Sequence, residues 1–352
     1  MEKLGSAGGG RGHLKIYLGA TPGAGKTFAM LREAHDLVRQ EHDVVVAFVE
    51  TYNRPRTVEL LQGLDIAPRT LVSYKGATLE DMDIAWVLKR KPEIALVDEL
   101  AHTNAPGLRH PKRWQDVEEL RDAGINVITT VNVQHVESVK DLVERVTGIV
   151  VRETVPDREL DGADVIQFVD IAPEALRKRM RHGNIYTKDK VDTALDNFFR
   201  PGNLAAMREI GLRLVADSMA RSRSVIDSPE DVLVAVSGGT TSEELMRRGV
   251  RLARRRGGFC LVVMVVTEEA EATQVDAYRE LAAQLGSSFA VLAGTDPANA
   301  IIRAARDAGS DHVVVGEMSR TSWLDRFRPT IVDRIIDGLP EADIHVIARF
   351  DR

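Results

Sequence analysis

The sequence has very little cysteine, and this excludes two classes of site. Its single cysteine, Cys260, lies in an apolar run and has no second thiol to pair with. A disulfide framework and a metal site built from several cysteines are therefore excluded, which fits a reducing compartment. We expect a cytoplasmic protein.

Long apolar runs and an excess of positive charge are also missing. No stretch approaches the roughly 20 apolar residues that a membrane helix needs, and the glycine-rich start lacks the apolar core of a signal peptide. The formal net charge is -6, so general affinity for nucleic acid is not expected. We take the arginine-rich segment 247–256 as a solvated helix face, and we expect neither a membrane span nor a nucleic-acid partner.

What is present is ordinary globular composition, with 44% hydrophobic and 28% charged residues among 352. That length suffices for about two or three domains. From Leu14 to Ile171, β-rich runs alternate with amphipathic helical patterns, which predicts βαβ units and a largely parallel sheet. The runs expected as strands are LKIYLGA, DVVVAFVE, RTLVSY, EIALVDE, NVITTVNV and DVIQFVDI.

Composition shifts along the chain predict its domain organisation. A glycine-rich head, expected to be disordered, covers 1–12, and a first domain covers 13–220. Within it, 173–220 loses the strand signals and is expected to be a helical appendage. A polar linker follows over 221–230, and in 231–352 strand and helix patterns alternate again, which predicts a smaller doubly wound α/β domain.

The stretch GATPGAGKT, Gly19 to Thr27, carries the clearest chemical signal. It lies between the first predicted strand and a helix, and it fits the phosphate-binding pattern G-x-x-x-x-G-K-[ST] except that Ala20 replaces the first glycine. Backbone N–H groups at such a helix start bind phosphate, Lys26 would reach the phosphates, and the Thr27 hydroxyl would bind Mg²⁺. The expected loop residues are Gly23, Ala24 and Gly25.

Two carboxylates follow a second buried strand, EIALV, at its carboxyl end. Asp98 would hold Mg²⁺, and Glu99 would polarise an attacking water, which makes Glu99 the candidate catalytic residue. The two motifs together predict binding of ATP with Mg²⁺, whereas hydrolysis is left open at this point.

Further polar residues follow the ends of predicted strands, where an open α/β sheet forms its ligand crevice. We expect one shared site for Glu50, Thr51, Arg54, His102, Thr103, Asn104, Asn132, Gln134 and His135. Arg109 and Arg113 lie in a proline-containing loop, and they are interpreted either as plain surface or as phosphate contacts.

The sequence from Gly12 to Ala220 is similar to the cytoplasmic N-terminal domain of the KdpD family, bacterial potassium-sensing histidine kinases. The segments that carry this resemblance are LKIYLGATPGAGKTFAML, VDELAHTN, KRWQDVEELRDAGINVITTVNVQHVES and RHGNIYTKDKVDTALDNFFRPGNLAAMREI. Residues 229–352 resemble the universal-stress-protein module that follows in that family. The resemblance implies a P-loop NTPase-like domain with a helical appendage, then a universal-stress-protein-like domain.

The resemblance also implies a role in two-component signalling that controls potassium-transport genes. ATP at Gly23, Gly25, Lys26, Thr27 and Asp98 would tune this signalling. The family's membrane helices and kinase core are not in this chain, so we expect either an input fragment or a short stand-alone form. Its partner would be a histidine-kinase core or another signalling protein, in cis or in trans, and we expect a homo-oligomer.

The second domain offers weaker ligand signals. The glycine pattern of ATP-binding universal stress modules is largely lost, because Gly316 is present but Ser319 replaces the second glycine and Ser237 stands in place of an aspartate. Some related modules bind cyclic di-AMP, for which Ser237 and Phe259 agree with the family pattern. Arg320 and Trp323 would bracket a phosphate and a base, or Trp323 would only fix its loop to the core.

Two other functions are compatible with the same residues. One is a stand-alone P-loop ATPase or small-molecule kinase, which turnover above a Lys26→Ala control would indicate. The other is a nucleotide-independent interaction scaffold, which the absence of nucleotide binding would indicate.

Overall fold

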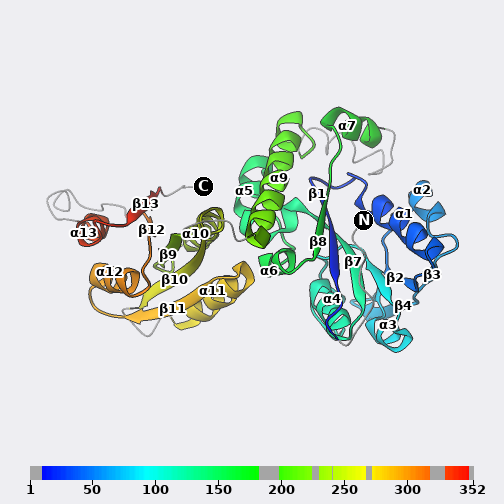
Figure 1. Ribbon diagram of the computed structural model, residues 1–352, viewed down its shortest axis with the longest axis horizontal. Helices are drawn as coiled ribbons and strands as arrows, with labels where there is room; N and C mark the ends of the chain where they lie inside the picture. Colours follow the sequence, from blue (N-terminus) through cyan, green and yellow to red (C-terminus); the bar gives the residue numbers. More distant parts are fainter. Residues whose placement is uncertain are drawn as a thin grey trace. The chain divides into compact units, whose positions relative to one another are not determined.

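The computed structural model describes residues 10–181, 198–223, 230–239, 241–266, 272–317 and 330–348. Its contacts divide the chain into two compact units. Unit 1 comprises Met1–Val155 and Glu159–Val215, and unit 2 comprises Pro156–Arg158 and Ala216–Arg352. Each unit is built on a parallel sheet (Figure 1), so the predicted mixed α/β class is confirmed. The expected disordered head falls outside the described residues over 1–9.

The elements of unit 1 follow the predicted alternation in most places. The strands are β1 (Leu14–Gly19), β2 (Val44–Phe48), β3 (Asp65–Ile66), β4 (Arg69–Tyr74), β5 (Ala77–Met82), β6 (Ile94–Val97), β7 (Asn126–Asn132) and β8 (Val165–Val169). The helices in this part of the chain are α1 (Lys26–Arg39), α2 (Pro55–Glu59), α3 (Ile84–Arg90), α4 (Arg113–Asp122), α5 (Lys140–Thr147), α6 (Asp157–Asp161), α7 (Pro173–Arg181) and α9 (Pro201–Arg223), with short 3-10 turns at Val133–His135 and Glu137–Val139. Helix α9 continues through the first residues of the segment expected as a linker.

The sheet of unit 1 has the order β3-β2-β6-β7-β1-β8. Every neighbouring pair is parallel, and β1 lies between β7 and β8. All carboxyl ends therefore meet at one edge, where the loop after β1 and the carboxylates after β6 come together. In the sequence these two segments are far apart.

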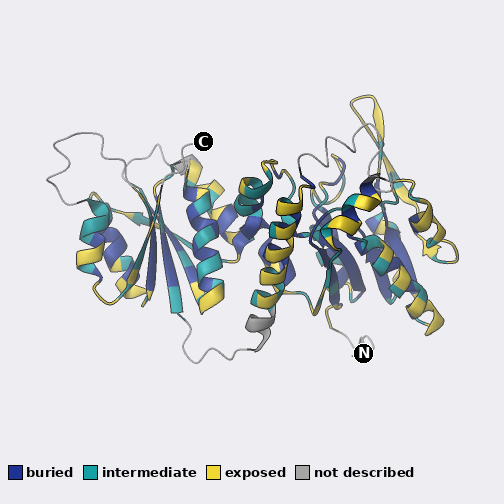
Figure 2. Ribbon diagram, turned by 90° about the horizontal axis from the view of Figure 1, so that it is seen from above, coloured by how far each residue is buried: buried dark blue, intermediate teal, exposed yellow. Residues whose placement is uncertain are grey.

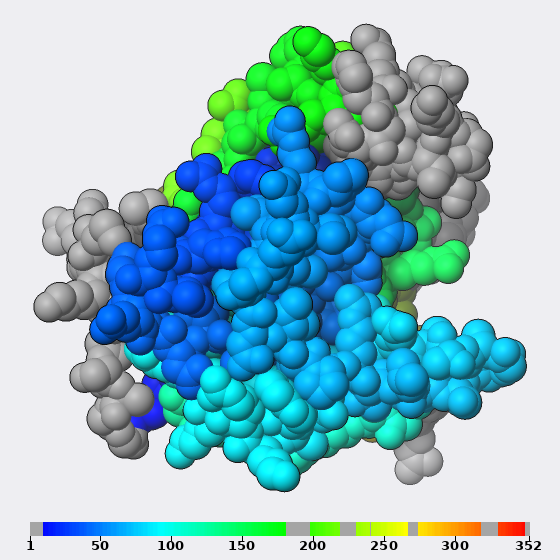
Figure 3. All heavy atoms as spheres, turned by 90° about the vertical axis from the view of Figure 1, so that its right-hand side faces the viewer, coloured from blue at the N-terminus to red at the C-terminus, as the bar shows by residue number. Residues whose placement is uncertain are grey.

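One strand prediction was wrong in its placement. The run RTLVSY forms β4, but β4 pairs antiparallel with β5 in a separate hairpin instead of joining the parallel sheet. Lys75 and Gly76 at the turn have φ of 49° and 80°, the left-handed pair that a tight two-residue hairpin requires. The hairpin is largely exposed and protrudes from unit 1 (Figures 2 and 3).

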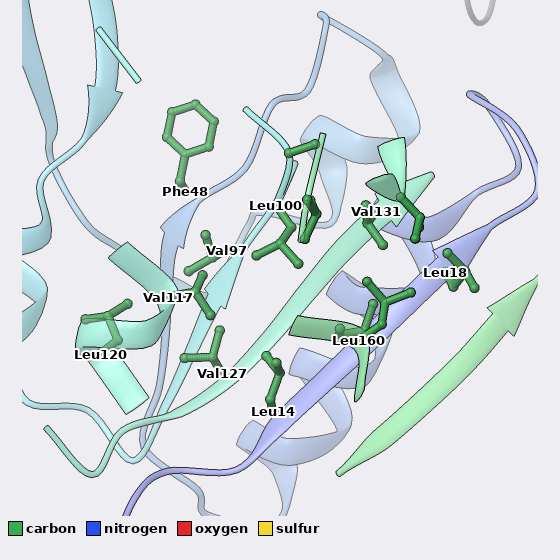
Figure 4. Packing of buried hydrophobic residues seen from close by; sticks show 14 of the residues in the cluster. Leu14, Leu18, Phe48, Val97, Leu100, Val117, Leu120, Val127, Val131 and Leu160 are labelled. Carbon is green, nitrogen blue, oxygen red and sulfur yellow. The ribbon is translucent and has the colours of Figure 1, made fainter. Parts of the chain in front are cut away.

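The inner strands β1, β2, β6 and β7 of the unit 1 sheet are buried on both faces, which explains why they are apolar without alternation. On one face Leu14, Leu18, Val97 and Val127 pack against helix residues such as Leu120 (Figure 4). On the other face the alternate residues of the same strands pack against α1. The members of that second cluster include Tyr17, Val44, Val46, Ile94, Leu96, Met30, Leu31 and Ala34.

Unit 2 repeats this plan on a smaller scale. Its strands are β9 (Glu230–Val236), β10 (Gly257–Val266), β11 (Ser288–Ala293), β12 (His312–Gly316) and β13 (Asp343–Ile347), in the parallel order β11-β10-β9-β12-β13. Its helices are α10 (Ser242–Arg256), α11 (Ala272–Leu285), α12 (Pro297–Asp307) and α13 (Ile331–Gly338). Helices α10 and α11 cover one face of the sheet, and α12 and α13 cover the other. Within the described ranges, no helix is both long enough and apolar enough to cross a membrane.

Candidate functional site

The loop between β1 and α1 has the backbone that its glycines allow. Gly23 and Gly25 have φ of 81° and 105°, in the region that favours glycine, and α1 begins at Lys26 directly after them. A methyl group on Gly19 would lie 2.6 Å from Cδ of Lys26, so the lysine side chain folds back across the end of β1. Gly19 is therefore the position at which a side chain would collide with Lys26. The sequence pattern has its first glycine at the position of Ala20, and Ala20 is buried there.

Lys26 is a buried cation at the sheet edge. Its exposed fraction is 9%, and its ammonium group donates a hydrogen bond to Oδ1 of Asn132 at the end of β7. Burial lowers the pKa of Lys26 to about 8, although the nearby carboxylates of Asp98 and Glu99 favour the charged form.

Asp98 directly follows β6, which lies between β2 and β7 in the sheet. It is 2% exposed, and Oδ2 accepts a hydrogen bond of 3.0 Å from the hydroxyl of Thr27 in the first turn of α1. Oδ1 accepts from the hydroxyl of Thr130 on β7, and the Asp98 N–H donates to the carbonyl oxygen of Phe48 on β2 at 2.8 Å. A carboxylate and a threonine hydroxyl are thus held side by side, and both are ligands that Mg²⁺ accepts.

Glu99 has an unusual backbone. Its φ is 59°, a left-handed value that non-glycine residues rarely adopt and that is often found at functional sites. Its side chain accepts a hydrogen bond from the hydroxyl of Tyr52, and its N–H donates to Oγ1 of Thr130 at 3.2 Å. Burial and the neighbouring Asp98 raise the pKa of Glu99, which makes this carboxylate a stronger base than an exposed one.

For Arg113, both sequence interpretations, plain surface and phosphate contact, were wrong. It is neither surface nor a phosphate contact, because its side chain is fully buried. The guanidinium donates to Oδ1 of Asp81 at 2.5 Å and to the carbonyl oxygen of Asp98 at 3.3 Å, and its carbon lies 3.8 Å above the ring centre of Phe48. Arg109, in contrast, is exposed and pairs with Glu119.

Asp81 is the carboxylate that balances Arg113. Burial alone would raise its pKa, but His102, the charge of Arg113 and the N–H groups of Ala105 and Met82 together lower it below the usual range. The charged pair therefore persists at neutral pH and ties the base of the β4–β5 hairpin to the strand end that carries Asp98.

The other strand-end polar residues have mixed roles. Asn132 contacts Lys26, and the charge of Arg54 acts on Lys26, so both belong to the site. Asn104 donates to the carboxylate of Asp116 at 2.6 Å, and the Thr103 N–H donates to Glu153 at 2.9 Å, so these two residues shape the following loop. The expectation of one shared site therefore describes only part of that set.

The sequence interpretation missed three residues. Thr130 contacts both Asp98 and Glu99, and the signal for it is a polar pair, Thr129 and Thr130, inside an otherwise apolar strand. Tyr52 contacts Glu99 from the loop after β2. Arg179 on α7 lies beside Gly25, and no local sequence signal distinguishes it from its neighbouring cations.

In unit 2 the structure separates Phe259 from two of the other ligand candidates. Ser237 and Gly316 come at the carboxyl ends of the neighbouring strands β9 and β12. The Phe259 N–H donates to Asp231 at the amino end of β9, which lies about 20 Å from Ser237 at the usual rise per strand residue. Phe259 therefore cannot share a small ligand with Ser237. Ser319, Arg320 and Trp323 lie outside the described residues.

The chain was compared with solved structures and with curated sequences. Several solved universal stress proteins resemble part of the chain, among them one in complex with cAMP and one from Archaeoglobus fulgidus in complex with dAMP. The first covers 35% of this chain and 98% of that protein at 15% identity and a TM-score of 0.30, and the second covers 34% and 96% at 20% and 0.26.

The sequence relatives are closer. The Mycobacterium tuberculosis sensor protein KdpD is 44% identical over 351 residues, covering 96% of this chain and 41% of that protein. The Escherichia coli sensor protein KdpD is 41% identical, covering 96% and 39%. This chain therefore spans less than half of the length of those two relatives. A putative sensor protein KdpD from Synechocystis is 39% identical, covering 96% of this chain and 94% of that protein.

A family model agrees with these relatives. The model described as KdpD, osmosensitive K+ channel His kinase sensor domain, matches residues 10–219, which is more than half of the chain. The chain belongs to the KdpD family.

Proposed function

We propose that unit 1 binds ATP with Mg²⁺ at the loop between β1 and α1, and that this nucleotide state is a regulatory input to a KdpD-type sensor kinase. The observation that carries the proposal is the hydrogen bond between Thr27 and Asp98. It joins the two motifs, which lie 71 positions apart in the sequence, at the edge where an α/β sheet binds its ligands.

The loop supports a role as a phosphate site. Gly23 and Gly25 have the backbone that lets successive N–H groups converge, and α1 presents its positive end at Lys26. The buried Lys26 adds a full charge, whereas Asp98 and Thr27 supply two oxygen ligands for Mg²⁺. Magnesium is commonly held by one or two carboxylates together with phosphates and waters, so this donor set fits it.

The signalling role rests on the family. Relatives described as sensor proteins cover 96% of this chain, and a nucleotide site within their matching region would report a metabolic or potassium-linked state to a kinase core, in cis or in trans, on the cytoplasmic side. Control of potassium-transport genes follows from the same resemblance. Cyclic di-AMP binding by unit 2 stays a prediction. Ser237 would have to support it without Phe259, and Arg320 and Trp323 lie outside the described residues.

A second candidate function is slow ATP hydrolysis. Glu99 supports it, because its raised pKa suits a general base and it directly follows the Mg²⁺-binding candidate Asp98. Its carboxylate accepts the Tyr52 hydroxyl in this structure, so that bond has to be exchanged for one to water before Glu99 can act. We therefore expect turnover to be low in the chain by itself.

The proposal is tested by titrating Mg²⁺-ATP into the full chain calorimetrically. We expect Lys26→Ala to weaken binding about 10- to 100-fold, because a charged hydrogen bond contributes about 1.5–3 kcal/mol. The exposed Lys89 on α3 provides the matched control, and Lys89→Ala should bind as the wild type does.

Phosphate release under the same conditions separates the two candidate functions. Release that Glu99→Gln abolishes while binding persists would favour the ATPase. Equal binding by wild type and Lys26→Ala would contradict the assigned site, and no binding by either would leave an interaction scaffold as the better description.

A further inference from the structure

Arg179 on α7 lies against the proposed phosphate loop. A methyl group on Gly25 would lie 3.7 Å from Nη1 of Arg179, so the guanidinium is beside the backbone at which α1 starts. The side chain is exposed, and it forms no hydrogen bond or ion pair with any residue that the structure describes. A cation therefore stands beside the loop with no carboxylate of the described chain to balance it.

The position of α7 follows from the sheet. Strand β8 runs parallel to β1, so the chain leaves β8 at the same edge as the loop, and the Ala20 N–H donates to the carbonyl oxygen of Val169 at 3.4 Å. Helix α7 begins at Pro173, just beyond that point (Figure 1).

Packing then fixes the orientation of α7. Leu176 and Met180 are buried together with Phe199, and the Arg177 guanidinium donates to the Phe199 carbonyl oxygen at 2.5 Å. Because residues three and four apart share a helix face, Arg179 lies at the border of this anchored face and is directed to the loop without being part of the packing.

The charges around the loop suggest what Arg179 contacts. Lys26 is buried under the loop and bonded to Asn132, whereas Arg179 approaches Gly25 from the solvent side. Two cations and the positive end of α1 thus face the same small region from different directions. An anion between them would relieve their repulsion, and a guanidinium is well suited to bind phosphate oxygens with two parallel hydrogen bonds.

We propose, on the basis of the proposed function, that Arg179 contacts the terminal phosphate of ATP bound at this loop. Lys26, Thr27 and Asp98 lie where the β- and γ-phosphates of a nucleotide on such a loop are held, and Arg179 closes that end from α7. The contact would exist with ATP and be absent with ADP. The position of helix α7 would then differ between the ATP-bound and the ADP-bound protein.

The test compares Mg²⁺-ATP and Mg²⁺-ADP affinities of the full chain in calorimetric titrations. We expect Arg179→Ala to weaken ATP binding about 10- to 100-fold while ADP affinity changes less than about twofold, and Arg179→Lys to recover part of the loss. The matched control is Arg213→Ala on α9, an exposed arginine that pairs with Glu209 and should bind both nucleotides as the wild type does.

Each result decides the question. Wild-type ATP affinity in Arg179→Ala, with Lys26→Ala still defective, would overturn this inference and leave the proposed function intact. An equal loss for ATP and ADP would overturn the assignment to the terminal phosphate. Absence of nucleotide binding by the wild type would overturn both proposals. Circular dichroism of Arg179→Ala should match the wild type, since the side chain bonds to no described residue.

Discussion

At the scale of single residues, Lys26 shows how burial sets the working range of a side chain. Burial lowers its pKa to about 8, so the free protein loses this positive charge as the pH rises above that value. A bound phosphate would favour the charged lysine and raise the pKa again. ATP affinity should therefore be highest below pH 8 and fall about 30-fold between pH 7 and 9.5, since the cost above the free pKa is about tenfold per pH unit.

Calorimetric titrations across this pH range measure the change in ATP affinity. Other titratable groups near Lys26 do not change their charge in the same range. Burial raises the pKa of Tyr52 and lowers that of His135, so neither titrates near pH 8 to 9. The last proton of a phosphate group is lost at about pH 6, below the range in which Lys26 titrates. The residual binding of Lys26→Ala should not vary with pH, and a wild-type affinity that is constant up to pH 9.5 would contradict the interpretation.

The residues of the proposed site were predictable from sequence to different degrees. Lys26, Thr27 and Asp98 are specified by short motifs next to strands, and the structure brings their side chains to one edge. Arg113 was not predictable, because its burial depends on a carboxylate, Asp81, that comes from a hairpin 32 positions away in the sequence. Local composition carries information on strand ends, but it carries none on which distant charge will face a loop arginine.

At the scale of elements, the same reasoning explains the misplaced strand. The runs IALV and VVVAF are continuously apolar, and both became central strands buried on two faces. The run RTLVSY mixes polar and apolar residues, a pattern that suits a half-exposed hairpin, but its partner ATLEDM has too few apolar residues to be recognised as a strand. Pairing between strands is a tertiary property, so the sequence indicated one hairpin strand and not the other.

The β4–β5 hairpin is linked to the sheet by a buried ion pair, which gives an element-scale prediction. Asp81 and Arg113 are 2% and 0% exposed. Asp81→Asn leaves the guanidinium buried without a countercharge, and we expect it to lower the free energy of unfolding of unit 1 by about 3–5 kcal/mol in urea denaturation of the full chain. Asp36→Asn removes an exposed partner of Arg39 on α1 and should cost less than about 1 kcal/mol.

A double substitution separates charge imbalance from packing. Asp81→Leu combined with Arg113→Met removes both charges and keeps apolar volume, so it should destabilise the protein less than Asp81→Asn does. A double variant that is at least as unstable as the single one would mean that the hydrogen bonds of Arg113 to the Asp98 carbonyl and of Asp81 to the Ala105 N–H dominate the energetics.

At the scale of the whole molecule, each unit has its own parallel sheet and its own buried clusters. We therefore expect two calorimetric unfolding transitions in the full chain. Mg²⁺-ATP at about 100 times its dissociation constant adds about 2.7 kcal/mol to the unit that binds it. That should raise the midpoint of one transition by about 5–10 °C and leave the other in place.

A substitution in unit 2 identifies which transition belongs to which unit. Gly249 on α10 lies over β9, and a methyl group there would be 2.1 Å from Cγ2 of the buried Val234. Gly249→Ala should lower the midpoint of the transition that ATP leaves unchanged, because overpacking at such a contact costs about 1–3 kcal/mol, and it should not alter the shift that ATP produces in the other. If ATP and Gly249→Ala moved the same one of two transitions, the nucleotide would be bound in unit 2, which would contradict the assigned site. A single transition moved by both would mean that the two units unfold as one cooperative body.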